Sequence, residues 1–137
     1  MKKALLVLSV GLLLGAQDQN KDAERFEGTW IMVSAEENGK DPGEDFVKKS
    51  RLVVKGKRHT VTLGDVTHKA THKLDPTKNP KTMDVQRDDG TEVEAIYELK
   101  DDTFTICLHM QGKPRPKEFS GKAGTEQRLH VWKREKK

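Results

Sequence analysis

Apolar and polar residues alternate in short runs through most of this chain, and turn residues separate the runs at intervals of about 8 to 12 residues. A period of two with breaks at this spacing is typical of an antiparallel sandwich or barrel. Two short stretches, Asn20–Glu27 and Gly43–Lys49, are expected to be helical. The predicted strands are Thr29–Ala35, Ser50–Lys55, Arg58–Leu63, Val66–Leu74, Lys81–Arg87, Thr91–Lys100, Thr103–Met110 and Gln127–Arg134.

Hairpin registers follow from the same pattern, because a slip of one residue turns every side chain of a strand to the other face of the sheet. Short loops at Gly56-Lys57, Gly64-Asp65, Asp88–Gly90 and Asp101-Asp102 gather the apolar residues on one face. The predicted pairs are Leu52–Val61, Val54–His59, Val61–His68, His59–Ala70, Met83–Ala95, Val85–Val93, Tyr97–Ile106, Leu99–Phe104 and Val93–Met110. A meander with one apolar face can close on itself. We therefore predict an all-β fold, an eight-stranded antiparallel up-and-down barrel with a short N-terminal helix.

The first and last predicted strands, around Trp30 and Trp132, are apolar on both faces and should pair to close the barrel. Their outer faces need a cover, and we expect the short helix that carries Phe26 to provide it. The connection 111–127 is long for a barrel turn. We expect it to be either a flap over the opening or a solvated loop, with Arg115-Pro116 and Phe119 as possible anchors.

The first 16 residues are organised like a signal peptide, with Lys2 and Lys3, an apolar run Ala4–Leu14 and the small residue Ala16 before a polar stretch. The run is shorter than the roughly 20 residues of a membrane span, so an uncleaved N-terminal anchor is the less favoured alternative. We expect export to the periplasm or the extracellular space, with no membrane span after cleavage. Residues 17–137 then form one domain, which we expect to be a monomer.

Charge and cysteine content narrow the possible functions. The chain carries a net charge of +4, which falls to +2 without Lys2 and Lys3. Basic residues are scattered among nearly as many acidic ones, which argues against nucleic-acid binding. Cys107 is the only cysteine, so no internal disulfide can form. Cys107 and His109 share a strand face about 6.6 Å apart, but a small buried thiol is favoured over a catalytic nucleophile.

The segment Phe26-Glu27-Gly28-Thr29-Trp30, a helical turn followed by Gly-x-Trp at the first strand, resembles the first signature of the lipocalin superfamily. The resemblance implies that Trp30 closes one barrel end and that Arg134, or alternatively Lys133, packs across it. More specifically, the chain is similar to a family of small exported lipocalin-like proteins of planctomycete-type bacteria without an assigned function. The further segments that carry this similarity are Val33–Ala35, Leu74–Thr77, Pro80–Thr82, Ile96–Leu99, Asp102–Cys107 and Arg115–Ser120.

Three histidines, His59, His68 and His72, fall on the predicted inward face. In the predicted register His68 and His72 are the diagonal neighbours of His59, each at roughly 7 to 8 Å, and they lie about 13 Å from each other. A metal contact through His59 is the weaker interpretation, because zinc usually needs three or four protein ligands. The favoured interpretation places the histidines at the barrel mouth, partly solvated and titrating near neutral pH.

Three classes of function remain, in a definite order. A binding protein for a small hydrophobic or amphipathic ligand comes first, because a barrel of about eight strands can hold one small molecule. A structural or interaction module of the cell envelope with a filled barrel comes second. An enzyme is third and is not expected, because no phosphate loop or catalytic triad pattern occurs. We expect no cofactor. The predicted ligand-lining residues are Leu52, Val54, His59, Val61, His68, His72, Met83, Tyr97, Ile106 and Met110.

Overall fold

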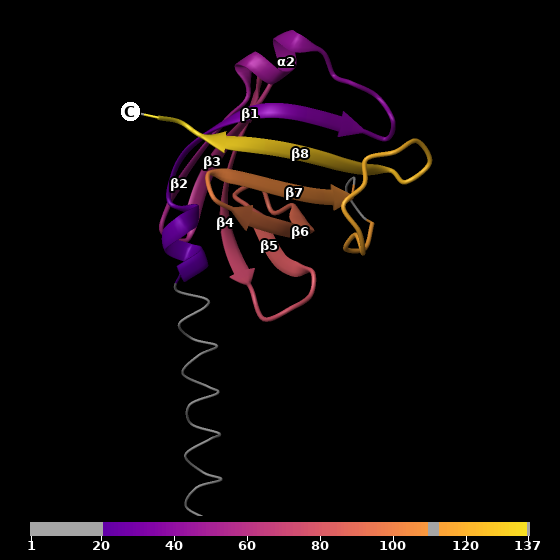
Figure 1. Cartoon of the computed structure of the whole chain (residues 1–137). Coiled ribbons are helices and arrows are strands. Elements are labelled where there is room, and N and C mark those ends of the chain that lie inside the picture. The colour runs from indigo at the N-terminus through magenta and orange to yellow at the C-terminus, as the bar shows by residue number, and fades with distance from the viewer. Residues whose placement is uncertain (1–20, 110–112, 137) are drawn as a thin grey trace, which may run out of the picture.

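The computed structural model describes residues 21–109 and 113–136, so the predicted signal peptide and Met110 lie outside the described residues. Eight strands form one closed barrel in sequence order, each antiparallel to both of its neighbours (Figure 1). The predicted fold class is confirmed. The strands are β1 Gly28–Glu37, β2 Arg51–Lys55, β3 Arg58–Leu63, β4 Val66–Asp75, β5 Lys81–Arg87, β6 Glu92–Lys100, β7 Thr103–His109 and β8 Gln127–Arg134.

The predicted hairpin registers are confirmed wherever the structure describes both partners. His59 pairs with Val54 on one side and with Ala70 on the other, and Met83 pairs with Ala95. The turn between β5 and β6 has Gly90 at φ 93°, the left-handed conformation that its three-residue loop requires. The alternation of apolar and polar residues therefore sets which face of each strand is inside.

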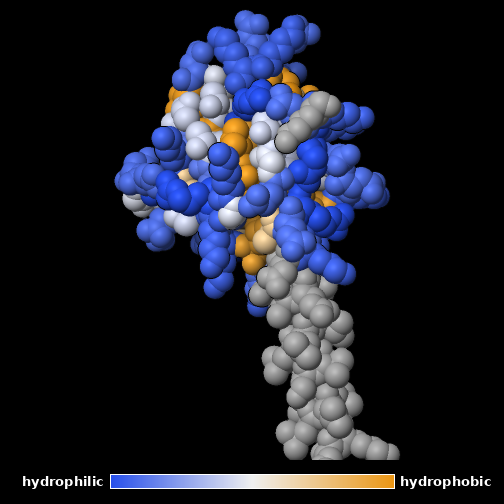
Figure 2. All heavy atoms as spheres, turned by 90° about the vertical axis from the view of Figure 1, so that its left-hand side faces the viewer, coloured by the Kyte–Doolittle hydropathy of each residue, from blue (hydrophilic) through white to orange (hydrophobic). Residues whose placement is uncertain are grey.

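Two short helices accompany the barrel, one over residues 21–26 and α2 over Glu44–Lys49. Figure 1 shows the helix of residues 21–26 (indigo) and α2 at opposite ends of the domain. Neither of these described helices has the length and apolarity needed to cross a membrane. The face of the domain shown in Figure 2 is mainly hydrophilic, with apolar residues in a streak through its middle and in small spots near its margins.

The barrel is sealed at the end that carries the helix 21–26 and the turns 56–57 and 101–102, which we call the closed end. Phe26 is only 1% exposed. The centre of its ring lies 4.7 Å from the ring centre of Phe104 and 6.3 Å from the ring centre of Trp30. The prediction that Phe26 covers the outer faces of β1 and β8 is therefore wrong. The ring is buried more completely inside the barrel, whereas Val33 on the outer face of β1 stays 50% exposed.

Arg134 fastens the closed end from outside. Its guanidinium lies 4.4 Å from the centre of the Trp30 ring and donates hydrogen bonds to the carbonyl oxygens of Glu27, at 2.6 Å, and Arg25. The Trp30 indole N–H in turn donates to the carbonyl oxygen of Phe26 at 3.0 Å. The residue that packs across Trp30 is thus Arg134 rather than Lys133, whose side chain is exposed. These contacts hold the helix 21–26 against the barrel.

A buried polar cluster adds a second attachment for the same helix. Asp22 is 3% exposed and accepts hydrogen bonds from the Tyr97 hydroxyl at 2.7 Å and from the Lys81 ammonium at 3.1 Å. Burial, together with the neighbouring Asp22 carboxylate, raises the pKa of Tyr97, so its hydroxyl stays protonated and keeps donating. The closed end is therefore held by aromatic packing and by charge-assisted hydrogen bonds together.

The plug at the closed end predicts a large effect of Phe26→Ala. Removing the ring leaves a cavity among aromatic side chains, so the free energy of unfolding should fall by about 3–5 kcal/mol in urea denaturation. Glu24→Ala on the same helical turn is the matched control, because Glu24 is exposed and its removal should change stability by less than about 0.5 kcal/mol. Equal stability of the two variants would show that the helix does not seal the barrel.

The connection between β7 and β8 lies against the outer wall of the barrel. Pro116 is fully buried, and the Cys107 thiol donates to the carbonyl oxygen of Ser120 at 3.4 Å. The side chain of Gln127 donates to the same carbonyl at 2.7 Å. The described part of the connection, 113–126, thus covers the outward pair Ile96–Cys107. The expectation of a flap over the opening or a solvated loop is wrong, because this apolar pair on the wall needs a cover.

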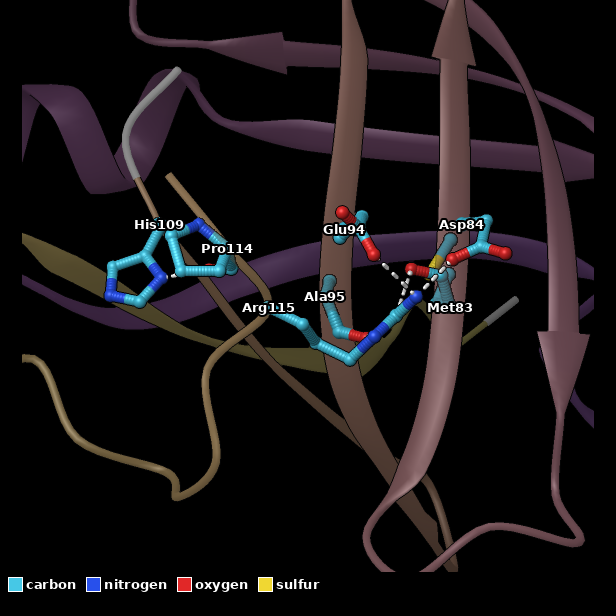
Figure 3. A network of polar contacts seen from close by, with 7 residues as sticks. All are labelled: Met83, Asp84, Glu94, Ala95, His109, Pro114 and Arg115. Atoms are coloured by element: carbon cyan, nitrogen blue, oxygen red, sulfur yellow. Dashed lines mark hydrogen bonds and ion pairs between the residues drawn. The ribbon is translucent and has the colours of Figure 1, made fainter. Parts of the chain in front are cut away.

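Arg115 anchors this connection to β5 and β6 (Figure 3). Its guanidinium donates to the carbonyl oxygen of Ala95 at 2.7 Å and to that of Met83 at 3.3 Å, and it pairs with the carboxylates of Glu94, at 3.0 Å, and Asp84. One arginine thereby joins two strands and one loop.

Burial beneath the loop also raises the pKa of the Cys107 thiol, which lowers the reactivity of the thiol.

Alkylation of Cys107 reports on this anchor. In the wild type, iodoacetamide should label the native thiol slowly, because the side chain is buried and protonated. Arg115→Ala removes charge-assisted bonds worth on the order of 1.5–3 kcal/mol, so labelling through local opening should be about tenfold faster or more. Lys117→Ala, an exposed change two residues away, is the control and should label like the wild type. Unchanged labelling of Arg115→Ala would remove the anchoring role.

Candidate functional site

A cavity of about 70 Å³ occupies the interior at the end opposite the helix 21–26, where the turns 64–65 and 88–91 lie; we call this the open end. The closed barrel creates the cavity, since alternate residues of seven strands point into it. Most of these side chains are aliphatic or aromatic, and a few polar ones join them. The cavity is lined by Leu52, His59, Val61, Leu63, His68, Ala70, Val85, Arg87, Val93, Phe104, Ile106, Leu108, Arg128, His130 and Trp132.

Five of the predicted lining residues border this cavity: Leu52, His59, Val61, His68 and Ile106. The other described ones, Val54, His72, Met83 and Tyr97, are buried in the barrel but do not border it. These four side chains lie outside the cavity because the register determines which face of a strand is inward, but not how far the packing of the closed end extends along the barrel.

Charged side chains surround the mouth of the cavity. Arg87 at the end of β5 and Arg128 at the start of β8 both border it, and His130 accompanies Arg128 on β8. Glu37 at the end of β1 accepts a hydrogen bond from His130, with Oε2 and Nε2 2.9 Å apart. This hydrogen bond is the main cause that lowers the pKa of Glu37, so the carboxylate is ionised at neutral pH.

Sequence reasoning missed Arg87 and Arg128 as site residues, although a signal was present. Arg87 continues the inward series of Met83 and Val85, and Arg128 precedes His130 and Trp132 in the inward series of β8. Extending the same alternation by one step would have placed both guanidinium groups inside.

Two of the predicted histidines form a direct pair in the barrel. Nδ1 of His59 lies 2.9 Å from Nδ1 of His72, and the two rings are tilted with centres 5.1 Å apart. His72 also packs edge-on against Phe26, at 5.1 Å between ring centres. Only one of the two Nδ1 atoms can carry a proton in such a contact, because one must donate and the other accept.

The histidine pair is buried rather than partly solvated, which corrects the expectation of titration near neutral pH. His59 and His72 are each 8% exposed. Burial, followed by the charge of His72, lowers the pKa of His59 to about 4. Burial lowers the pKa of His72 as well. Both rings are therefore neutral at physiological pH, and they act as hydrogen-bonded core groups between the plug and the cavity.

No metal site is visible in the part of the chain that the structure describes. No three His, Cys, Asp or Glu side chains there come together in a metal-binding arrangement. His68 borders the cavity with His59, while His72 is turned toward Phe26. Zinc would require further ligands beyond the His59–His72 pair.

A larger hollow of about 820 Å³ lies over β4, β5 and β6. It is bordered chiefly by exposed side chains of the outer face, among them Lys73, Glu92 and Glu94. A ligand site is typically enclosed by apolar walls, with a few polar groups that point into it. The interior cavity has this character and the outer hollow does not, so the interior cavity is the candidate site.

No protein-family model matches this chain, and no curated protein matches it.

The histidine pair predicts an acid-dependent loss of stability. The pKa of His59 is about 4 in the folded protein against 6.5 for the free side chain. The stability that depends on a neutral His59 is therefore fully present above pH 6.5 and is lost as the pH falls through 4. Between pH 7 and pH 4 the free energy of unfolding should therefore fall further in the wild type than in His59→Gln, by on the order of 2–3 kcal/mol. Urea unfolding at both pH values measures the difference, and identical pH profiles would contradict it.

Proposed function

We propose that this protein is a lipocalin-like binding protein that holds a small, partly apolar molecule in the cavity at the open end. The observation that carries the proposal is the asymmetry of the barrel. One end is filled by Phe26, Trp30 and Phe104, whereas the other retains a cavity with apolar walls and a polar mouth. An interior of this kind, formed largely in advance, is the usual setting for a small ligand.

The size of the cavity limits what can be enclosed. Pockets for drug-sized ligands measure about 300–1,000 Å³, and the cavity here has about 70 Å³. Only a short apolar group fits inside the walls. The polar end of the ligand then lies at the mouth, where Arg87, Arg128 and His68 border the cavity.

We further propose that the protein acts outside the cytoplasm. The support is the N-terminal pattern of Lys2 and Lys3 followed by Ala4–Leu14, which is that of a signal peptide. A periplasmic or extracellular monomer that binds a small molecule agrees with a hydrophilic outer surface and with a domain of this size.

The same small volume favours a second function. The aromatic packing of the closed end and the His59–His72 pair fill most of the barrel, as expected of a structural or protein-interaction module of the cell envelope. Such a module would carry no ligand. Native mass spectrometry of gently purified protein separates the two functions, because a bound molecule adds a defined mass and an empty barrel adds none.

A substitution that fills the cavity tests the proposal directly. Val61→Phe places a ring in the space that the ligand would take, so binding of hexanamide, a neutral probe with a short apolar chain, should weaken about tenfold or more. Ligand-detected NMR with the purified protein measures the binding. Val53→Phe, the same change on the outward face of β2, is the control and should bind like the wild type. Equal binding by both variants, or none by the wild type, would contradict the proposal.

A further inference from the structure

Two arginines reach the mouth of the cavity from separate parts of the barrel wall. Arg87 pairs with Ala70 at the end of β5, and Arg128 pairs with Leu108 near the start of β8. β6 and β7 lie between these strands, so the two side chains converge on the cavity and do not run side by side on one sheet face. Convergent guanidinium groups at an apolar pocket are an arrangement suited to an anion.

Carboxylates engage the two guanidinium groups only weakly among residues 21–109 and 113–136. Arg87 forms no ion pair there, and Arg128 forms only a long one, with its Nε 3.9 Å from Oε2 of Glu37 and beyond hydrogen-bonding distance. Arginines of the outer surface differ in this respect. Arg51 holds Glu135 at 2.7 Å and Arg58 holds Asp88 at 2.8 Å. The arginines at the cavity thus keep donors available for another group.

The proximity of the two positive charges adds a reason to bind an anion. Burial lowers the pKa of Arg87, and the charge of Arg128 lowers it further, while Asp89 opposes the effect. Two like charges in a partly desolvated site repel each other, and a carboxylate between them would relieve this repulsion. Its two oxygens match the fork of N–H donors that each guanidinium presents.

Glu37 restricts the charge of the anion. Its carboxylate is held by His130 at 2.9 Å, and Glu37 is the register partner of Arg128 on the neighbouring strand, on the same face of the sheet. The negative charge of Glu37 offsets one of the two positive charges of Arg87 and Arg128, so these three side chains together carry one positive charge. One singly charged group balances that charge, whereas a doubly charged phosphate would be repelled by Glu37.

The walls beneath the arginines specify the rest of the ligand. Val85, Val93 and Leu108 border the cavity next to Arg87 and Arg128, so the part of the ligand that enters is apolar. An engineered cavity of about 150 Å³ accepts benzene, and the cavity here is about half as large. An aliphatic chain of a few carbons is therefore the group that fits.

We infer that the ligand is a small monocarboxylate, whose charged group is bound between Arg87 and Arg128 and whose short aliphatic chain occupies the cavity. This inference rests on the proposed function and deepens it by naming the class of ligand. Hexanoate is the probe, and hexanamide, which has the same chain length and no charge, is its neutral partner.

Isothermal titration calorimetry of the purified protein with the two probes tests the inference. The wild type should bind hexanoate about tenfold more tightly than hexanamide or better, because only hexanoate gains charge-assisted hydrogen bonds. Arg87→Gln and Arg128→Gln should each bring the ratio of hexanoate to hexanamide affinity down to about one, because the charge that distinguishes the two probes is lost. Arg51→Gln removes the same charge from the outer surface and should keep the preference. Thermal unfolding of each variant checks that the barrel is folded.

The possible results separate the inference from the proposed function. Loss of the preference in both cavity variants, but not in Arg51→Gln, supports the inference. Equal binding of the two probes to the wild type overturns the monocarboxylate and leaves a binding protein for neutral molecules. A preference for hexanoate that survives both Arg87→Gln and Arg128→Gln overturns the role of these arginines. Binding of neither probe overturns the inference and the proposed function together.

Discussion

The packing of Arg134 and Phe26 around Trp30 is the contact on which the rest of the domain depends. Trp30 lies where β1 begins, Phe26 fills the interior beside it, and Arg134 reaches back from the end of β8 to the carbonyl oxygens of the helix 21–26. The first and last strands are thereby joined at the same place where the barrel is sealed. A closed barrel has no free strand edge, which protects the chain from edge-to-edge pairing.

Sealing one end determines what the interior can contain. Phe26, Trp30 and Phe104 pack at the closed end, and the neutral His59–His72 pair lies next to them. Buried polar groups are tolerated because each has a partner: Asp22 has Tyr97 and Lys81, and the two histidines have each other. Only the opposite end keeps a cavity, and charge is concentrated at its mouth. The packing that stabilises the barrel and the proposed binding site thus lie at different ends of it.

This division also explains the position of the long connection after β7. Arg115 ties residues 113–126 to the outer wall, away from the open end of the barrel. The loop hides Ile96 and Cys107, which are apolar outward groups that a barrel wall would otherwise expose. The open end is thus left to α2, which contacts the turn 64–65 through Phe46 and Lys49, and to the cavity-bordering side chains of Arg87, Arg128 and His68.

The strand segments and hairpin registers were determined by the sequence alone, because strand periodicity and turn residues act between neighbours along the chain. The contents of the barrel were decided only by the tertiary structure. Phe26 could equally have covered the wall, and nothing local shows that His59 meets His72 rather than His68, or that Arg87 and Arg128 approach the same cavity from β5 and β8. These contacts join residues distant in sequence, and they exist only once closure brings the strands to fixed positions around a shared interior.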